Sequence, residues 1–360
     1  MSSIISYVER GDSLMERGKY VKKEKKKFTF LTVLVIILAI IFIALAVCIL
    51  MVSGLLGQIT RVEDIEVTMS QEQIDDIIKE TDPIDPESTL ENISSDDVHL
   101  NEEAVEKVET GDHIIQVLLV GQDNESKSVR SRTDSMILCT INKNTKTLTM
   151  TSFMRDMYVK IPGYYDQRLN VAYVLGGFET LYDTMEHSFG VEVENGVAVN
   201  FASFKEVIDA VGGVDVVLTS REAAHLNGQN YTWGLVEGLN HMNGDAALAY
   251  SRIRKLDSDF GRTGRQRTVM LALLEKAKTL SLTELYALVE AVVPMVITDM
   301  SNAEIIGMAM EIAPLLSDLT IVSQRIPMDG GYYDAMIDGM AVLVPDLTMN
   351  RQLLEDTIGN

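Results

Sequence analysis

The chain has only two cysteines in 360 residues, and we expect both to be unpaired. Cys48 lies in a long apolar run and Cys139 in an expected strand, so no disulfide framework is available. We interpret Cys139 as a small buried side chain. The five histidines are scattered and lack the spacing of a zinc site, and neither a Gly-x-Ser-x-Gly motif nor a Walker-type loop occurs. These absences argue against zinc enzymes, serine hydrolases and P-loop nucleotidases.

Positive charge is also scarce. The chain has 31 Lys and Arg against 53 Asp and Glu, which gives a formal net charge of -22 and a calculated pI near 4.6. A nucleic-acid partner requires a broad basic surface, so this balance argues against one. The imbalance is uneven, because residues 1–27 carry 8 basic and 4 acidic side chains, whereas residues 61–112 carry 3 and 18.

Against this background, the stretch Tyr250–Arg267 concentrates positive charge. Arginine suits the two-pronged capture of phosphate oxygens, although a solvated charged surface is the alternative interpretation. If the segment is extended, Arg252 and Arg254 lie on one side of it. The charged residues of the stretch are Arg252, Arg254, Lys255, Asp257, Asp259, Arg262, Arg265 and Arg267.

Residues 28–52 form an almost wholly aliphatic run, and no charged residue occurs from Phe28 to Gln58. About 20 apolar residues span a bilayer as a helix, so we expect one transmembrane helix there. A cleaved signal peptide is the alternative, but its apolar region would be shorter and followed by small residues. The lysines before the run predict a single-pass protein of the cell membrane, with residues 1–27 in the cytoplasm and the remainder outside.

An acidic segment poor in aromatic residues follows over residues 61–112, and Asp82-Pro-Ile-Asp-Pro86 interrupts any helix in it. Like charges extend such a segment, so we expect an extracellular stalk. The globular extracellular domain is expected over residues 113–360, with its core in residues 113–280.

Short apolar runs alternate with helical patterns in this domain. The alternation predicts an α/β fold with α-β-α layers around a central mixed sheet. Residues 220–240 are expected to form a polar loop. We expect strands over residues 113–120, 135–141, 147–153, 191–200, 214–218 and 320–326, and helices over residues 170–188, 201–211, 244–250, 268–280, 283–293, 303–313 and 346–357.

Polar side chains gather where these elements end. Carboxylates bind Mg²⁺, which usually shares its ligand shell with substrate phosphates. Arginines neutralise phosphate oxygens and stabilise the charge of phosphoryl transfer. The combination predicts a phosphate or diphosphate site. The carboxylates are Asp123, Asp134, Asp156 and Asp259, and the arginines are Arg130, Arg132, Arg155, Arg168 and the five of the arginine stretch.

Six motifs, in their order along the chain, resemble the LytR-CpsA-Psr family, and so does the sequence of tail, single span and extracellular domain. The resemblance is strong over residues 113–280 and looser towards the C-terminus. Met154 stands where the family commonly has proline, and Arg168 where lysine is frequent. The motifs are Gly121-Gln-Asp123, Arg132-Thr-Asp134-Ser-Met, Phe153-Met-Arg155-Asp156, Arg168-Leu-Asn170-Val-Ala-Tyr, Tyr250-Ser-Arg252-Ile-Arg254 and Asp259-Phe-Gly-Arg262-Thr-Gly-Arg265-Gln266.

The resemblance implies a phosphotransferase that moves an anionic glycopolymer, such as teichoic acid or capsular polysaccharide, from a polyprenyl-diphosphate carrier to peptidoglycan. It implies a new phosphodiester on a muramic acid hydroxyl, Mg²⁺ held by Asp123 and Asp134, and apolar helices around the prenyl chain. Arg155, Asp134 and Asp259 would be catalytic, with Asp134 or Asp259 as the proton acceptor. The residues implied to bind the diphosphate are Arg155, Arg168, Asn170, Arg252, Arg254, Arg262, Arg265 and Gln266.

Two other functions use the same kind of site. One is a membrane-anchored receptor or regulator that binds a polyprenyl phosphate without turning it over. The other is a polyprenyl-diphosphate diphosphatase, in which water replaces the sugar hydroxyl as acceptor. The number of arginines and the paired aspartates favour a transferase over a receptor, because binding alone requires fewer charged groups.

Overall fold

The computed structural model describes residues 90–359 apart from 99, 101–102, 124–129, 257–258, 282–283, 285–287 and 289, and also residues 54, 56–62, 72, 74 and 75. The expected membrane span over residues 28–52 lies outside these residues. Within the part of the chain that is described, no helix is long and apolar enough to cross a membrane.

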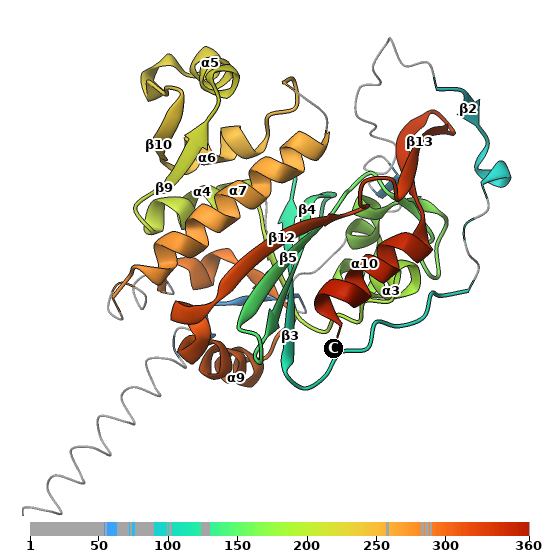
Figure 1. Cartoon of the computed structure of the whole chain (residues 1–360), viewed down its shortest axis with the longest axis horizontal. Coiled ribbons are helices and arrows are strands. Elements are labelled where there is room, and N and C mark those ends of the chain that lie inside the picture. Colours follow the sequence, from blue (N-terminus) through green and yellow to red (C-terminus); the bar gives the residue numbers. More distant parts are fainter. Residues whose placement is uncertain are drawn as a thin grey trace, which may run out of the picture. The chain divides into compact units, whose positions relative to one another are not determined.

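A seven-stranded sheet forms the centre of the unit that spans residues 58–360 (Figure 1). The pairs β1–β11, β8–β3 and β5–β12 are parallel, and the pairs β11–β8, β3–β4 and β4–β5 are antiparallel. The expected mixed sheet is therefore confirmed. Its strands, in spatial order, are β1 (Thr60–Arg61), β11 (Ile297–Thr298), β8 (Gly196–Val199), β3 (Ile114–Gln122), β4 (Thr133–Asn142), β5 (Thr147–Phe153) and β12 (Thr320–Ile326).

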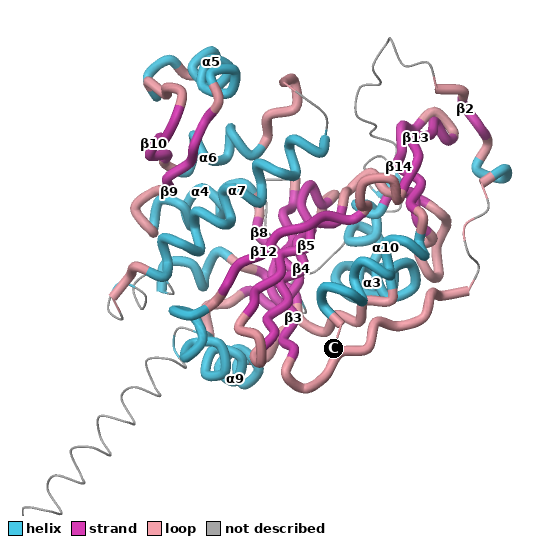
Figure 2. Tube along the Cα trace, in the orientation of Figure 1, coloured by secondary structure: helices cyan, strands magenta, loops and turns pink. Residues whose placement is uncertain are grey.

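Helices cover both faces of this sheet, as Figure 2 shows. The alternation of side chains along a strand sends Leu118 and Leu138 to one face, where they join the core under α3 (Ala172–Phe189) and α10 (Leu347–Ile358). It sends Ile137 to the other face, under α7 (Asp259–Lys278), α9 (Asn302–Ile312) and the 3-10 helix η6 (Ala313–Asp318). The expected α-β-α layering is confirmed by these two cores.

A smaller cluster of elements packs beside the sheet around its own buried core. Within it, β9 (Val214–Leu218) pairs antiparallel with β10 (Gly238–Met242). The helices around them are α4 (Phe201–Ala210), α5 (Ser220–Gln229), α6 (Gly244–Ser251) and the middle of α7, with the 3-10 helix η4 (Tyr231–Trp233) between α5 and β10.

Two expectations for this region were wrong. Residues 220–240 are not a polar loop, because Thr219 and Glu222 form a reciprocal capping box that starts α5. The helix expected over residues 268–280 begins earlier, because α7 starts at Asp259 and includes the last three arginines of the stretch.

The described parts of residues 58–112 belong to the folded unit, although the sequence predicts a stalk there. β1 pairs with β11, and the short strand β2 (Asn92–Ile93) pairs with β13 (Tyr332–Ile337), which forms a hairpin with β14 (Met340–Pro345). Val108 lies in the main core. The remaining elements are β6 (Tyr158–Val159), β7 (Gln167–Arg168) and the 3-10 helices η2 (Ser95–Asp97), η3 (Leu169–Val171) and η5 (Val293–Met295).

Candidate active site

A bulge at the edge of the sheet sets the direction of the Asp134 carboxylate. Gly121 pairs with Ser135 across the β3–β4 ladder, but Gln122 pairs with Thr133, so Asp134 is an extra residue on β4. Such a bulge redirects a side chain out of the regular alternation. Asp134 lines a cavity at this edge of the sheet.

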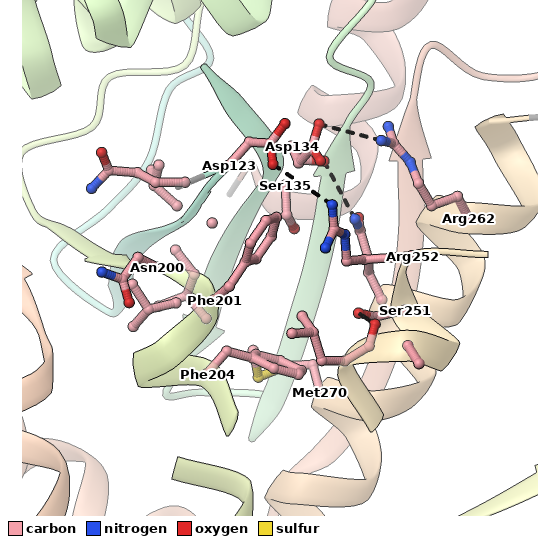
Figure 3. A pocket seen from close by; sticks show the side chains of 18 of the residues that line it. Asp123, Asp134, Ser135, Asn200, Phe201, Phe204, Ser251, Arg252, Arg262 and Met270 are labelled. Carbon is pink, nitrogen blue, oxygen red and sulfur yellow. Dashed lines mark hydrogen bonds and ion pairs between the residues drawn. The ribbon is translucent and has the colours of Figure 1, made fainter. Parts of the chain in front are cut away.

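Asp123 follows directly after β3 and lies beside Asp134, as Figure 3 shows. Its backbone N–H donates to the carbonyl oxygen of Arg132 at 3.0 Å, which fixes the chain where it leaves the strand. Its side chain lines the same cavity. The two carboxylates expected to hold a metal ion are thus brought together.

Three arginines from distant parts of the chain converge on Asp134. Arg155 Nη1 donates to Asp134 Oδ1 at 2.8 Å. Arg262 Nη1 lies 3.4 Å from the same oxygen, and Arg254 Nη2 lies 3.4 Å from Oδ2. Arg155 follows β5, Arg254 follows α6, and Arg262 belongs to α7. The Asp134 carboxylate therefore joins the sheet to the neighbouring helices.

Behind Arg155 lies a buried extension of this cluster. Asp156 has one oxygen 3.3 Å from Arg155 Nε and the other 3.7 Å from Arg168 Nη1, and both guanidinium groups are buried. The backbone N–H of Asn170 donates to the Arg155 carbonyl oxygen at 3.2 Å. Arg168 and Asn170 are therefore brought close to Arg155, but neither they nor Arg155 line the cavity.

Arg252 lies at the C-terminal end of α6 and is half exposed. Its guanidinium carbon sits 4.1 Å from the centre of the Phe201 ring, and Nη2 is 3.9 Å from Asp123 Oδ1. Gln266 Nε2 is 3.4 Å from the backbone carbonyl oxygen of Asp134. Both side chains line the cavity and present N–H donors near the two aspartates.

The two carboxylates have opposite pKa shifts. Burial, and then the nearby negative charge of Asp134, raises the pKa of Asp123. Burial alone would also raise the pKa of Asp134, but Arg155, Arg262 and Arg254 outweigh it and hold that pKa below its ordinary value. Asp134 is therefore firmly ionised, whereas Asp123 is the group that more readily takes a proton.

The cavity has a volume of about 670 Å³ and two chemically different ends (Figure 3). The carboxylates and arginines occupy one end. The rest of the lining comes from the sheet and helices α4, α6 and α7 and is mostly apolar, although it also includes Asp245 of α6. Its apolar residues include Leu119, Ile137, Val197, Phe201, Phe204, Leu248 and Met270. The cavity thus combines a charged end with a mostly apolar one.

Arg265 is not brought into this cluster. Its Nε donates to Glu222 Oε1 at 2.7 Å and its Nη1 to the Ile253 carbonyl oxygen at 3.1 Å, so it joins α7 to α5 and to the loop after α6. Its expected contact with a diphosphate stays a prediction. Asp259 is the first residue of α7, and its side chain lies outside the described part of the structure.

The apolar residues of the cavity lie outside the motifs that predict the site. Phe201 and Phe204 are three apart on α4, and Met270 follows Gln266 by four residues on α7. Residues three or four apart share a helix face. That spacing could have placed Met270 on the same face as the site residues of α7, and thus in the cavity.

The pair of aspartates fits Mg²⁺ better than a metal held by protein ligands alone. Among the described residues, no group of three or more His, Cys, Asp or Glu could hold a metal ion. Mg²⁺ is commonly held by one or two carboxylates, with water and substrate phosphates completing its shell. Asp123 and Asp134 supply two carboxylates next to N–H donors suited to a phosphate, so the donor set fits this ion.

The sequence profile of the LytR_cpsA_psr family matches residues 79–357, which is most of the chain. This chain belongs to that family. The match includes every site residue described above, and it begins before the domain boundary expected at residue 113.

Similar proteins within the family carry more specific names. The polyisoprenyl-teichoic acid–peptidoglycan teichoic acid transferase TagU of Bacillus licheniformis is 39% identical over 168 residues, which is 46% of this chain and 53% of the relative. The chain therefore aligns with about half the length of this curated relative. A structure described as TagT bound to LIIa-WTA has 28% identity and a TM-score of 0.57, covering 71% of this chain and 95% of the other. Another, of YwtF (TagT) with bound octaprenyl pyrophosphate lipid, has 26% identity, a TM-score of 0.54 and coverage of 72% and 98%.

Proposed function

We propose that this member of the family transfers an anionic glycopolymer from a polyprenyl-diphosphate carrier to peptidoglycan and forms a phosphodiester. One observation carries the proposal: a single cavity of about 670 Å³ joins an arginine–carboxylate end to an apolar end. A lipid diphosphate likewise joins a charged diphosphate group to an apolar prenyl chain. The similarity to a protein solved with octaprenyl pyrophosphate supports this reading.

In this proposal the prenyl chain lies among Phe201, Phe204, Leu248 and Met270, where burial removes its apolar surface from water. The diphosphate then lies at the polar end, within reach of Arg252, Arg254 and Arg262. Arginine suits this position because its planar group can bind two phosphate oxygens at once. The arginines that now share Asp134 would divide their hydrogen bonds between that carboxylate and the diphosphate.

The reaction is an in-line displacement at the phosphorus next to the glycan. The oxygen of a peptidoglycan hydroxyl forms a new bond to this phosphorus, and the bond to the bridging oxygen breaks. Polyprenyl phosphate leaves with the electron pair of the broken bond, and the hydroxyl proton passes to a carboxylate. Arg254 and Arg262 would stabilise the negative charge that develops on the phosphate oxygens.

The pKa shifts favour Asp123 over Asp134 as the proton acceptor. A general base needs a pKa that is not far below the working pH. Burial and Asp134 raise the pKa of Asp123, whereas the surrounding arginines lower that of Asp134. We therefore infer that Asp134 orients the arginines and that, of the two, Asp123 accepts a proton more readily while no metal ion is bound to it. Asp259, which the sequence also predicts as a possible proton acceptor, remains a candidate for that role.

Asp123 and Asp134 are also the residues that would hold Mg²⁺. When bound, this ion would neutralise charge on the diphosphate and make the departing phosphate a better leaving group. Our proposal includes anchoring by one helix over residues 28–52, with residues 1–27 in the cytoplasm and the catalytic domain outside the cell membrane, where peptidoglycan is found.

The test uses the full-length chain in detergent micelles with a synthetic polyprenyl-diphosphate glycan, peptidoglycan oligomers and Mg²⁺. Mass spectrometry of the products should show a glycan–phosphate–peptidoglycan adduct and free polyprenyl phosphate. The adduct should disappear with a chelator and in Asp134→Ala. Free glycan phosphate without an adduct would identify a diphosphatase instead, and lipid binding without turnover across a panel of glycan donors would identify a receptor.

A further inference from the structure

Arg267 is the one arginine of the stretch without an assigned role, and its environment differs from that of its neighbours. Arg252, Arg254, Arg262 and Arg265 each lie within 4 Å of a carboxylate oxygen. Among the described residues, Arg267 has no such partner, and its Nη1 is buried without a hydrogen bond. A buried donor left without a partner is costly, so it indicates a ligand or ordered solvent at this point.

Arg267 lines a second cavity, of about 370 Å³, on another side of α7 from the first. Arg265, Thr268 and Leu271 also line it from α7, while Ser323 lines it from β12. Arg262, Gln266 and Met270, which line the first cavity, are absent from this one. A group bound here therefore does not compete with a diphosphate bound beside Asp134.

The charges of this second cavity suit one anionic group. Arg265 and Glu222 neutralise each other at 2.7 Å, which leaves Arg267 as the uncompensated charge among the described residues that line the cavity. Burial, and then the nearby positive charge of Arg325, lowers the pKa of Arg267. An anion would relieve this repulsion and supply the missing acceptor for Nη1. The hydroxyl group of Ser323, which also lines the cavity, adds a further donor.

We propose that this cavity, between α7 and β12, binds a carboxylate of the peptide part of peptidoglycan and so holds the acceptor while its hydroxyl reaches the first cavity. The proposal rests on the proposed function for the identity of the acceptor. A polyanionic glycan suits the cavity less well, because a chain of phosphates requires several uncompensated cations and the described lining offers only Arg267. β12 is also the last strand of the sheet in the described residues, and an extended peptide can lie beside an edge strand.

Binding of a soluble muropeptide to the full-length chain in detergent, measured by calorimetry without any lipid donor, tests the site separately from catalysis. Arg267→Gln should weaken binding about tenfold, since a hydrogen bond to a charged group is lost. The same muropeptide with amidated carboxyl groups should bind the wild-type chain as weakly as the unmodified muropeptide binds Arg267→Gln. Ser323→Asp, on an exposed position of β12, should also abolish binding by placing a negative charge in the cavity.

Arg221→Gln is the matched control, because it removes one positive charge from an exposed position that lines neither cavity. It should bind the muropeptide like the wild type. Equal binding by wild type, Arg267→Gln and Ser323→Asp would overturn the proposal. So would Arg267-dependent binding of a lipid-free teichoic acid oligomer in place of the muropeptide. In steady-state transfer, Arg267→Gln should raise the KM for peptidoglycan and leave the KM for the lipid donor unchanged.

If the wild-type chain forms no adduct but binds the muropeptide through Arg267, the transferase proposal fails and the second site stands. Thermal unfolding of each variant, compared with the wild type, separates a loss of binding from a loss of the fold.

Discussion

Arg155 and Asp134 form a buried ion pair, with Nη1 and Oδ1 2.8 Å apart and side chains only 4% and 10% exposed. The pair joins the end of β5 to the bulge on β4. Because Arg155 also contacts Asp156, it compensates two carboxylates at once. Its removal would therefore affect the fold as well as the site.

Arg155→Ala should lower the free energy of unfolding by about 3 kcal/mol, because Asp134 loses its shortest ion pair and Asp156 loses one of its two arginines. Asp134→Asn should cost less stability in the Arg155→Ala background than in the wild type, because the ion pair between the two residues is already gone. Chemical denaturation of the full-length chain, followed as a double-mutant cycle, measures the coupling. Additive effects of the two substitutions would contradict the importance of the pair for stability.

Arg252→Ala should behave differently, because Arg252 is half exposed and its removal exposes no buried charge. We expect a change in unfolding free energy within about 0.5 kcal/mol. Transfer should fall by about 10²–10³, the usual loss when one donor to a developing oxyanion is removed. Arg221→Ala, on an exposed position outside both cavities, is the control and should keep full activity. Full activity in Arg252→Ala would exclude its proposed contact with the diphosphate.

The pH dependence of transfer should be set on its acid side by Asp123. Asp134 has a lowered pKa and stays ionised as pH falls, whereas Asp123 has a raised pKa and takes a proton first. Because a proton on Asp123 competes with Mg²⁺ for the carboxylate, activity at limiting Mg²⁺ should fall as pH falls through the pKa of Asp123. Since Arg252 lowers that pKa, Arg252→Gln should shift the acid limb of the residual activity to higher pH. A limb at the same pH in both enzymes would show that another group controls it.

The same shifts make opposite contributions to stability. The ordinary pKa of both aspartates is close to 3.8. The lowered pKa of Asp134 adds stability that is present above this ordinary value and is lost as pH falls through the folded-state pKa. The raised pKa of Asp123 favours folding only while Asp123 is protonated, and that advantage is lost as pH rises through its folded-state pKa. At neutral pH, Asp123→Asn should therefore stabilise the chain by about 0.5–1 kcal/mol while it abolishes transfer. Thermal unfolding at neutral pH and at pH 4 should show a smaller gain at the lower pH.

Local patterns in the sequence predict the layers of this fold but not the connections between distant elements. The apolar runs that predict β3, β4 and β5 are confirmed by the structure, because their side chains alternate between two cores. The missed helix α5 had a local signal, since Thr219 and Glu222 have the spacing of a capping box. The sequence analysis predicted a loop there instead of α5, because residues 220–240 are polar and contain glycine.

The candidate site also depends on contacts between distant parts of the chain that local sequence patterns do not predict. The motifs identify the aspartates and arginines by type, but no local pattern predicts that Asp134 is a bulge residue or that Arg262 reaches it across 128 positions of sequence. Arg265 carries the same side chain as Arg262, yet it pairs with Glu222, because its position on α7 directs it to α5. Such differences depend on tertiary packing, which sequence spacing does not determine.

The apolar end of the first cavity should distinguish donors by the length of their prenyl chain. Phe204→Ser removes a large apolar side chain from the lining, and burial of such a group is worth about 1.5–3 kcal/mol. The KM for a long-chain polyprenyl donor should therefore rise at least about tenfold. A donor whose short prenyl chain does not reach Phe204 should show little change, and kcat should be similar for both. Met310→Ser, on an exposed position of α9, should leave both donors unaffected. An equal loss for long and short donors would place the prenyl chain somewhere other than this cavity.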